Sequence, residues 1–239
     1  MKKKKPLRFY VAMAVGKVSA IFLRMFGRRA SHFPGACALQ ICRDFLSYLE
    51  KPNHFICVTG TNGKTTTSNL LASLLRSMGY RVTNNSFGSN IKEGVVSALM
   101  LNSTLLGVHK NEYAVIEVDE RSSIRIFPEM QPDYLLCTNI MRDSIMRNAH
   151  PDFISFVINS SISENTMLIL NADDFICAAI APQCRRRFYF GISADQPAEN
   201  KKYGAKDVVY CPKCGQRLIA DYLRFEHIGR WRCSNCDCQ

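Results

Sequence analysis

Short apolar runs alternate with helical patterns through the middle of the chain. The runs that predict strands lie, in chain order, at residues 55–58, 81–83, 113–118, 134–138, 167–170 and 188–190. Between them, apolar residues recur at helical spacing over residues 64–78, 92–101 and 153–160. Short hydrophobic strands separated by helices are typical of a mostly parallel sheet that is covered on both faces. The pattern therefore predicts an α/β fold for residues 51–207.

Residues 1–50 are predicted to form a separate, basic and helical segment. Over residues 9–26, helical spacing aligns one apolar stripe, which consists of Val11, Val15, Val18, Phe22 and Met25. Lys17 and Arg24 interrupt this stretch, so it lacks the unbroken run of about 20 apolar residues that a membrane span requires. Two interpretations stay open. Either the stripe packs against the rest of the protein, or it forms a cationic amphipathic helix on a membrane surface.

Two other helices are predicted in more detail. A turn at residues 33–35 leads into a helix over residues 36–49. The helix over residues 64–78 has an apolar face that consists of Leu70, Leu71, Leu74, Leu75 and Met78. Gly79 directly follows this helix and predicts its end, because glycine adopts the left-handed conformation of a helix terminus at little cost.

Charge is concentrated at the N-terminus. The formal net charge is +11, the first 29 residues carry nine Lys or Arg, and no acidic residue precedes Asp44. A basic leading segment favours contact with an anionic surface such as phospholipid or nucleic acid. A solvated terminus is the alternative.

The nine residues VTGTNGKTT, at positions 58–66, follow the first predicted strand and open a helix. This context is typical of a phosphate-binding loop, because glycines let the backbone curl and the helix N-terminus offers unpaired N–H groups. Lys64 is expected to reach the outer phosphates, and the Thr65 hydroxyl to bind Mg²⁺. An ordinary turn is the alternative. Val58 stands where the Walker pattern has its first glycine, so the loop is a variant of that pattern.

Cysteine usage predicts a metal site near the C-terminus. Of eleven cysteines, four form the pairs Cys211–Cys214 and Cys233–Cys236, which 18 residues separate. This spacing is typical of a tetrahedral zinc site, and four thiolate ligands leave no position for water, so the zinc is predicted to be structural. Residues 208–239 are accordingly interpreted as a zinc ribbon. Most other cysteines are scattered singly among apolar residues, which fits a reducing cytosol better than a secreted disulfide framework.

The variant loop resembles that of the Mur ligases and folylpolyglutamate synthetases, which join a carboxylate to an amine using ATP. Within the Mur ligase superfamily, the chain most resembles the MurT family, the ligase subunits of lipid II isoglutaminyl synthases. The motifs that carry this resemblance are PGA (34–36), TGTNGKTTT (59–67), EVDE (117–120), TNIMRD (138–143), NADD (171–174), FGI (190–192) and the four-cysteine ribbon. The resemblance covers essentially all 239 residues. It implies a Mur-ligase-type ATP-binding domain with an inserted or terminal zinc ribbon.

Strand positions and the resemblance together assign candidate site residues. The nucleotide-binding candidates are Gly60, Thr61, Asn62, Gly63, Lys64, Thr65, Thr66, Asn139, Asn171 and Asp173. A helix cap is the alternative role for the last two. Glu117 ends a predicted buried strand and is expected to complete, with Thr65, the Mg²⁺ shell. Asp119 and Glu120 belong to the same EVDE motif as Glu117. For these two residues, a surface charge without a role in the site is the alternative interpretation.

The resemblance also implies a reaction and its partners. In this family, ATP phosphorylates the D-glutamate α-carboxylate of the lipid II stem peptide. Ammonia from a GatD-type glutaminase then converts the acyl phosphate to D-isoglutamine, a step of peptidoglycan biosynthesis. The implied cofactors are ATP, Mg²⁺ and Zn²⁺, and the implied partners are the glutaminase and membrane-anchored lipid II, without nucleic acid. The expected location is the cytoplasm, at the inner face of the membrane, with possible surface contact through the basic N-terminus.

Two departures from the family pattern limit these expectations. The chain stops at Gln239, directly after the ribbon, whereas the family continues into a C-terminal domain that supplies a catalytic aspartate. We therefore expect a truncated chain without a catalytic residue of its own, which binds ATP but does not amidate alone. Residues 143–150 read DSIMRNAH where the family has DQLDRYGE. The alternatives are a non-catalytic ATP- and zinc-binding remnant, a nucleic-acid-binding zinc module, or another P-loop ATPase or kinase.

Overall fold

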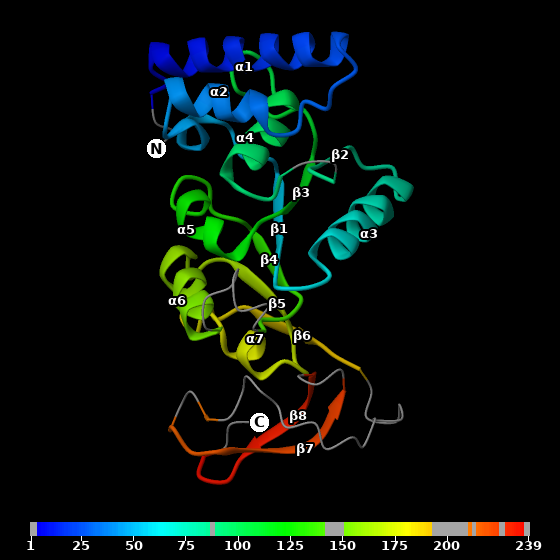
Figure 1. Cartoon of the computed structure of the whole chain (residues 1–239), viewed down its shortest axis with the longest axis vertical. Coiled ribbons are helices and arrows are strands. Elements are labelled where there is room, and N and C mark those ends of the chain that lie inside the picture. Colours follow the sequence, from blue (N-terminus) through cyan, green and yellow to red (C-terminus); the bar gives the residue numbers. More distant parts are fainter. Residues whose placement is uncertain are drawn as a thin grey trace.

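A parallel sheet forms the centre of the molecule (Figure 1). The computed structural model describes residues 4–86, 89–141, 151–192, 210–211, 214–224 and 228–236. Its strands are β1 (His54–Thr59), β2 (Val82–Asn84), β3 (Tyr113–Glu117), β4 (Tyr134–Cys137), β5 (Met167–Asn171) and β6 (Arg187–Phe190). They form one six-stranded sheet in the order β2-β3-β1-β4-β5-β6, with every neighbouring pair parallel. The predicted α/β class with a mostly parallel sheet is confirmed.

Helices lie on both sides of this sheet (Figure 1). They are α1 (Leu7–Met25), α2 (Phe33–Ile41), α3 (Lys64–Ser77), α4 (Lys92–Leu101), α5 (Ser123–Ile126), α6 (Pro151–Ser161) and α7 (Phe175–Ala179), with 3₁₀ turns η1 (Phe45–Tyr48) and η2 (Glu120–Ser122). α3 covers one face, whereas α4, α5 and α6 cover the other. α1 and α2 stack outside α4, at the β2 and β3 side of the molecule.

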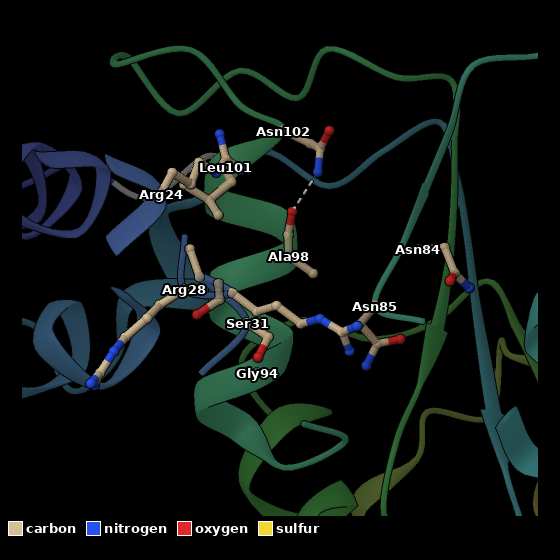
Figure 2. A pocket seen from close by; sticks show the side chains of 12 residues that line it. Arg24, Arg28, Ser31, Asn84, Asn85, Gly94, Ala98, Leu101 and Asn102 are labelled. Atoms are coloured by element: carbon tan, nitrogen blue, oxygen red, sulfur yellow. Dashed lines mark hydrogen bonds between the residues drawn. The ribbon is translucent and has the colours of Figure 1, made fainter. Parts of the chain in front are cut away.

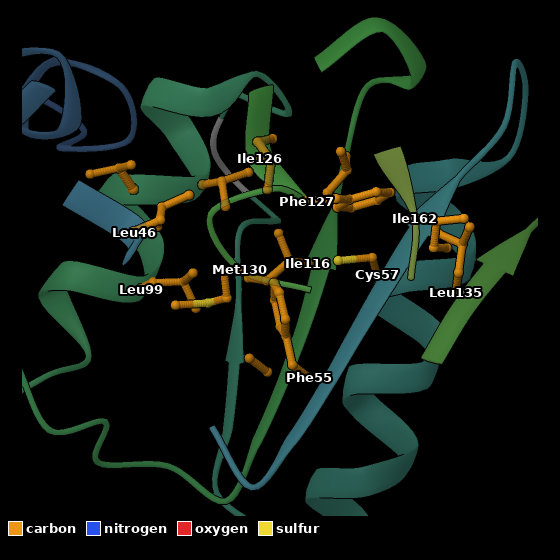
Figure 3. Close-up of a cluster of buried hydrophobic side chains, with 14 of the residues drawn as sticks. Leu46, Phe55, Cys57, Leu99, Ile116, Ile126, Phe127, Met130, Leu135 and Ile162 are labelled. Atoms are coloured by element: carbon orange, nitrogen blue, oxygen red, sulfur yellow. The ribbon is translucent and has the colours of Figure 1, made fainter. Parts of the chain in front are cut away.

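Two hydrophobic clusters hold the layers together, one on each face of the sheet. The larger cluster joins Phe55, Cys57 and Ile116 of the strands to Leu99 of α4 and Phe127 after α5 (Figure 3). The smaller cluster joins alternate residues of the same strands, Ile56, Val58 and Val115, to Leu71, Ala72 and Leu75 of α3. Because successive strand residues face opposite sides, strands that are apolar throughout can support a core on each face.

The exposed face of α3 differs from the prediction. Leu70, Leu74 and Met78 are exposed, whereas only Leu71 and Leu75 of the predicted apolar face pack on the sheet. Ser68 and Ala72 are buried between them, because small side chains let the helix approach the strands closely. Gly79 adopts a φ of 91° directly after the helix terminus, as predicted for a glycine that ends a helix.

α1 packs through small residues and exposes large ones. Its buried residues are Phe9, Ala12, Met13, Gly16 and Ala20. The predicted apolar stripe lies on the opposite face, where Val18, Phe22 and Met25 are 64%, 60% and 77% exposed. The helix therefore packs on the protein, but with the face opposite to the predicted stripe. Contact of the stripe with a membrane surface stays a prediction. In the described part of the chain, no helix combines the length and apolar character needed to cross a bilayer.

The predicted turn at residues 33–35 and the single helix over residues 36–49 are wrong. Pro34 lies in the first turn of α2, where its fixed φ and missing N–H are tolerated. Gly35 allows α2 to cross α4, since a Cβ there would lie 1.9 Å from the Glu93 carbonyl oxygen. α2 then ends at Ile41, and a separate 3₁₀ turn follows.

A small antiparallel hairpin follows the sheet domain and packs on α7. It consists of β7 (Leu218–Arg224) and β8 (Ile228–Cys233). Leu218, Trp231 and Cys211 form a hydrophobic cluster with Phe175 of α7. The Gly229 N–H also donates to the Asp173 carbonyl oxygen at 2.7 Å. The hairpin is therefore attached to the segment that follows β5.

β6 is the outermost strand of the sheet on its β5 side among the described residues. It pairs with β5 along one edge only. Its three aromatic residues, Phe188, Tyr189 and Phe190, are all exposed. Among the described residues, the strand therefore combines an unpaired backbone edge with exposed aromatic side chains.

Candidate functional site at the carboxyl ends of the strands

The loop between β1 and α3 has the backbone geometry that its glycines predict. Gly60 and Gly63 adopt φ values of 125° and 79°, which side chains rarely allow. Gly60 also has no room for a side chain, because a Cβ would lie 2.2 Å from Thr138 Oγ1 and 2.8 Å from the Asn139 carbonyl oxygen. The loop thus runs directly against the end of β4 and turns into the N-terminus of α3.

Asn139 holds this loop in place from the end of β4. Its side-chain oxygen accepts from the Asn62 N–H at 3.0 Å, and its side-chain N–H donates to the Asn62 carbonyl oxygen at 3.0 Å. The Asn139 backbone carbonyl accepts from the Thr61 N–H at 2.9 Å. Thr138 adds a bond from its hydroxyl to the Asn62 carbonyl at 2.6 Å. Asn139 therefore fixes the conformation of the loop through these hydrogen bonds. Its contact with a nucleotide stays a prediction.

Lys64 lies across the loop and is paired with a buried acid. Its ammonium donates to the Gly60 and Thr61 carbonyl oxygens and forms an ion pair with Glu120 at 3.3 Å. Burial raises the pKa of the Glu120 carboxyl group, and the nearby Lys64 ammonium opposes that shift. The surface alternative for Glu120 is wrong, because its side chain is only 10% exposed. The ion pair fixes the only cationic side chain of the loop at its mouth.

Asp119 has a local role beside Glu120. Its carboxylate accepts from the Ser122 N–H and hydroxyl, which caps η2. Its own N–H donates to the Asn90 carbonyl at 2.9 Å. The cap turns the chain after β3, and this turn brings Glu120 back toward Lys64.

Thr65 and Glu117 come together as predicted for a cation site. The Thr65 hydroxyl donates to one Glu117 carboxylate oxygen at 2.8 Å, and the Asn90 side chain donates to the other at 3.0 Å. Asn85 holds the Glu117 backbone from both sides, with bonds of 2.8 and 2.9 Å. Glu117 is buried, and no Lys or Arg of the described chain pairs with it. A buried carboxylate beside a hydroxyl is a donor set that suits Mg²⁺. The sequence does not identify Asn85 and Asn90 as partners of Glu117. Several asparagines lie close together in this loop, and their spacing does not show which side chains point toward the site.

Asn171 and Asp173 organise the next strand end. The Asn171 side chain donates to the Thr138 carbonyl oxygen at 2.9 Å and accepts from the Asp173 N–H at 3.0 Å. The Asp173 carboxylate accepts from the Ile192 N–H at 2.7 Å. The helix-cap alternative for these two residues is wrong, because Asp174 caps α7 by accepting from the Cys177 N–H at 2.9 Å. Both residues are buried at the same edge as the β1–α3 loop, and their nucleotide contact stays a prediction.

The remaining loop candidates are exposed or half-buried around the N-terminus of α3. Asn62, Gly63 and Thr66 face solvent, and Thr61 is half-buried. The Thr61 hydroxyl bonds to the Met141 backbone, with the Met141 N–H donating at 3.0 Å. The altered segment 143–150 lies outside the described residues. The structure therefore places the loop, Glu117 and Asn139 in one site.

The four predicted metal ligands form a separate cluster. Their sulfur atoms all lie within 4.8 Å of one another, with Cys211 and Cys236 at 3.6 Å and Cys214 and Cys233 at 3.4 Å. A backbone hydrogen bond from Gln216 lowers the pKa of Cys214 to about 6, which favours the thiolate that binds metals. Tetrahedral coordination by zinc at about 2.3 Å corresponds to sulfur separations of about 3.8 Å. The cluster thus fits a tetrahedral metal. His227 and Cys238, the only histidine and the fifth cysteine of residues 208–239, lie outside the described residues.

The model of the family described as Mur ligase middle domain matches residues 58–226. The chain is 32% identical over 229 residues to the lipid II isoglutaminyl synthase (glutamine-hydrolyzing) subunit MurT of Staphylococcus aureus strain COL, covering 95% of this chain and 51% of that protein. It is 31% identical over 239 residues to the subunit of the same name from Streptococcus pneumoniae, covering 98% of this chain and 52% of that protein.

A solved structure shows the same fold. The pseudomurein peptide ligase type C from Methanothermus fervidus superimposes with a TM-score of 0.57 and 25% sequence identity, over 82% of this chain and 38% of that one. The chain spans about half the length of the two curated relatives from Staphylococcus aureus and Streptococcus pneumoniae, of which it covers 51% and 52%.

Proposed function

The chain belongs to the Mur ligase family, and from this premise we propose that it is the ATP-binding part of an amide ligase of peptidoglycan biosynthesis. Its proposed reaction activates the D-glutamate α-carboxylate of the lipid II stem peptide as an acyl phosphate. Glutamine-derived ammonia from a glutaminase partner then yields D-isoglutamine. The names of relatives with 32% and 31% identity support this choice of substrate and partner. The observation that carries it is the pairing of Lys64 with Glu120 beside Thr65 and Glu117.

The loop residues fit ATP and Mg²⁺ in distinct roles. The N-terminus of α3 and the Gly63 turn present backbone N–H groups toward a phosphate. Thr65 and Glu117 would hold Mg²⁺ through their adjacent oxygens. Lys64 would exchange its loop carbonyl partners for phosphate oxygens, while Glu120 keeps its ammonium at the mouth of the loop. Bound ATP would supply the phosphoryl group, and the fixed positive charge of Lys64 would stabilise the charge that moves during its transfer.

The cysteine cluster is proposed to hold a structural Zn²⁺. Four sulfur atoms within 4.8 Å of one another satisfy a closed tetrahedral shell. The cluster also lies in the hairpin that packs on Phe175 through Trp231. Zinc would therefore order the hairpin and, through it, the segment after β5.

An isotope-transfer experiment tests the proposed chemistry. Lipid II labelled with ¹⁸O in the D-glutamate α-carboxylate is incubated with ATP, Mg²⁺, glutamine, the glutaminase subunit and this chain. The part of the Staphylococcus aureus relative that the chain does not span is supplied in trans. An acyl phosphate intermediate transfers a single ¹⁸O atom to inorganic phosphate, which mass spectrometry detects. The chain without the added part is expected to bind ATP and leave lipid II unamidated.

The isotope experiment also separates the alternatives. Phosphate without label, together with labelled isoglutamine, would reject the acyl phosphate route. ATP binding without turnover in any mixture would favour a non-catalytic remnant. A chain that lacks ATP binding would remove the ligase proposal entirely.

We also propose that α1 lies on the inner membrane surface, where the chain would meet membrane-anchored lipid II. Its exposed face carries Val18, Phe22 and Met25, and the first 29 residues of the chain carry nine Lys or Arg. An exposed apolar helix face in a strongly basic segment is typical of helices that bind anionic membranes without crossing them. This proposal places the molecule in the cytoplasm at the site of its substrate.

Vesicle binding is expected to fall when the exposed stripe becomes acidic. Replacing Phe22 and Met25 together with glutamate should weaken binding to phosphatidylglycerol vesicles by at least about tenfold, because each buried apolar side chain contributes about 2 kcal/mol. Sedimentation with the vesicles measures the change. The matched control replaces Leu70 and Leu74 of the exposed α3 face with glutamate. Equal losses in both double variants would argue against a specific role of α1.

A further inference from the structure

The hairpin of β7 and β8 contacts the predicted nucleotide-binding edge of the site at the segment that follows β5. The Gly229 N–H of β8 donates to the Asp173 carbonyl oxygen at 2.7 Å. Trp231, two residues later in the same strand, belongs to one hydrophobic cluster with Phe175. Figure 1 shows the hairpin next to α7, at the end of the molecule opposite to α1. One hydrogen bond and one apolar cluster thus join the hairpin to residues 173–175.

A series of hydrogen bonds continues from Asp173 to the loop between β1 and α3. The Asp173 N–H donates to the Asn171 side-chain oxygen at 3.0 Å, and the Asn171 side chain donates to the Thr138 carbonyl oxygen at 2.9 Å. The Thr138 hydroxyl donates to the Asn62 carbonyl oxygen at 2.6 Å. Asn171, Asp173 and Thr138 are buried. Because a buried polar group is costly to leave without its partner, a displacement of Asp173 is transmitted toward the loop.

Asp173 is held between three segments of the chain. Its carboxylate accepts from the Ile192 N–H, which follows β6, at 2.7 Å. Gly191 lies so close to this carboxylate that a Cβ there would be 3.1 Å from one of its oxygens. The Asp173 backbone bonds to Asn171 at the end of β5 and to the hairpin. The position of Asp173 therefore depends on the hairpin as well as on the sheet.

The hairpin itself is expected to change state with its metal. Among the described residues, its buried hydrophobic cluster consists of Phe175, Cys211, Leu218 and Trp231. Two-stranded hairpins with so small a core are marginally stable in water. Zinc that four thiolates hold contributes its binding free energy to folding. Metal loss should therefore open the hairpin and release the contacts of Gly229 and Trp231.

We infer that the four-cysteine hairpin positions the nucleotide-binding edge through Asp173, so that zinc and ATP strengthen each other's binding. This inference rests on the proposed function, which assigns ATP to this edge. With zinc bound, Gly229 and Trp231 hold residues 173–175, and the hydrogen bonds from Asp173 hold the loop. Asp173 is thus a positioning residue. Because coupling between two binding equilibria is reciprocal, ATP raises the affinity for zinc by the same factor as zinc raises the affinity for ATP.

The opposite side of the site is expected to be independent of zinc. The sheet order places β1 and β4 between β3 and β5. On the β3 side, Asn85 holds the Glu117 backbone with bonds of 2.8 and 2.9 Å. A cavity of about 430 Å³ borders Asn85 and lies between α4 and the segment that links α1 to α2 (Figure 2). We therefore expect loss of zinc to weaken nucleotide binding and to leave the Thr65–Glu117 contact in place.

Linked titrations test this inference. Calorimetry measures the affinity for a non-hydrolysable ATP analogue in excess Mg²⁺, with the zinc-loaded chain and after treatment with a chelator selective for zinc over magnesium. Competition with a chromogenic chelator measures the zinc affinity with and without the analogue. Each ligand should lower the dissociation constant of the other by one common factor, within the range of about 5–150-fold that is usual for coupled sites. Equal affinities with and without the second ligand would overturn the inference.

Trp231→Ala tests the route of the coupling. It removes the contact with Phe175 and keeps all four cysteines, so the variant should bind zinc while the common factor falls toward one. Ile219→Ala is the matched control, because Ile219 lies in the same hairpin and is 40% exposed. It should keep the wild-type factor. Should Trp231→Ala fail to bind zinc, Phe175→Ala removes the same contact from outside the hairpin.

The outcomes also separate this inference from the proposed function. Binding of the analogue to neither the zinc-loaded nor the zinc-free chain would reject the proposed function, and the inference with it. Equal binding to both forms would overturn the inference alone. A wild-type coupling factor in both Trp231→Ala and Phe175→Ala would also overturn it, because the hairpin would then not act through residues 173–175.

Discussion

Replacing Lys64 with alanine is expected to reduce ATP-dependent phosphoryl transfer by about 10²–10³-fold, the range for loss of a single preorganised charge-stabilising group. The structure already holds the Lys64 ammonium at the mouth of the loop through Glu120. Alanine removes this charge and leaves Glu120 buried without its partner, which also disfavours an anionic ligand. The measurement is the release of γ-phosphate in the complete mixture with lipid II and glutamine.

Lys110→Ala is the matched control for this prediction. Lys110 is exposed, and it lies in the segment that precedes β3. The control should keep the wild-type rate. If Lys64→Ala also kept that rate, the background would come from another ATPase and the ligase proposal for this chain would fail.

Replacing Cys211 and Cys236 with serine is expected to abolish binding of zinc at the four-cysteine cluster. Structural zinc contributes about 10–16 kcal/mol of apparent binding free energy in small domains. Loss of the metal should therefore unfold the hairpin of β7 and β8, whose described apolar contacts are few. The parallel sheet has its own core and should stay folded. Metal analysis by mass spectrometry and hydrogen exchange of the hairpin amides measure the two effects.

Cys37→Ser provides the control for metal binding, because Cys37 lies in α2 and outside the cluster. This variant should keep its metal and its hairpin protection. A double cysteine variant that still bound one equivalent of zinc would show that other residues hold the metal. Unchanged hairpin protection after metal loss would show that packing on Phe175 suffices.

The sheet is the part of the fold that the sequence predicts best. Strands such as β3 are apolar at nearly every position and are bounded by polar loops, so their pattern depends little on distant contacts. The α3 boundary follows from Gly63 and Gly79, whose positive φ values mark local backbone requirements. These features are short-range, which is why a single sequence reveals them.

Helix faces depend on distant contacts and are predicted less well. In α1, Gly16 packs closely against α4. A Cβ at residue 16 would lie 2.5 Å from the Met100 side chain, so this position has no room for a larger residue. Hydrophobicity alone favours the larger residues Val18 and Phe22, which the structure leaves exposed. Close helix packing selects small side chains, and no pattern within α1 reports the partner that imposes it.

The residues of the candidate site also fall into those that a local motif predicts and those that depend on distant contacts. Gly60, Lys64 and Thr65 follow from a motif whose spacing encodes their geometry. Glu120 could not be assigned, because its burial depends on the turn that Asp119 caps after β3. The cavity beside Asn85 joins segments far apart in the chain, so it has no sequence signal at all.

The edge of β6 that faces away from β5 pairs with no other strand of the described chain, and this affects how the protein behaves at high concentration. Half of the backbone groups of an outermost strand point away from the sheet. Beside them, Phe188, Tyr189 and Phe190 expose hydrophobic surface. Such a strand is a template for another strand. We expect purified protein to self-associate as its concentration rises, through intermolecular sheet extension at β6. A lysine in place of Tyr189 would then improve solubility without disturbing the core.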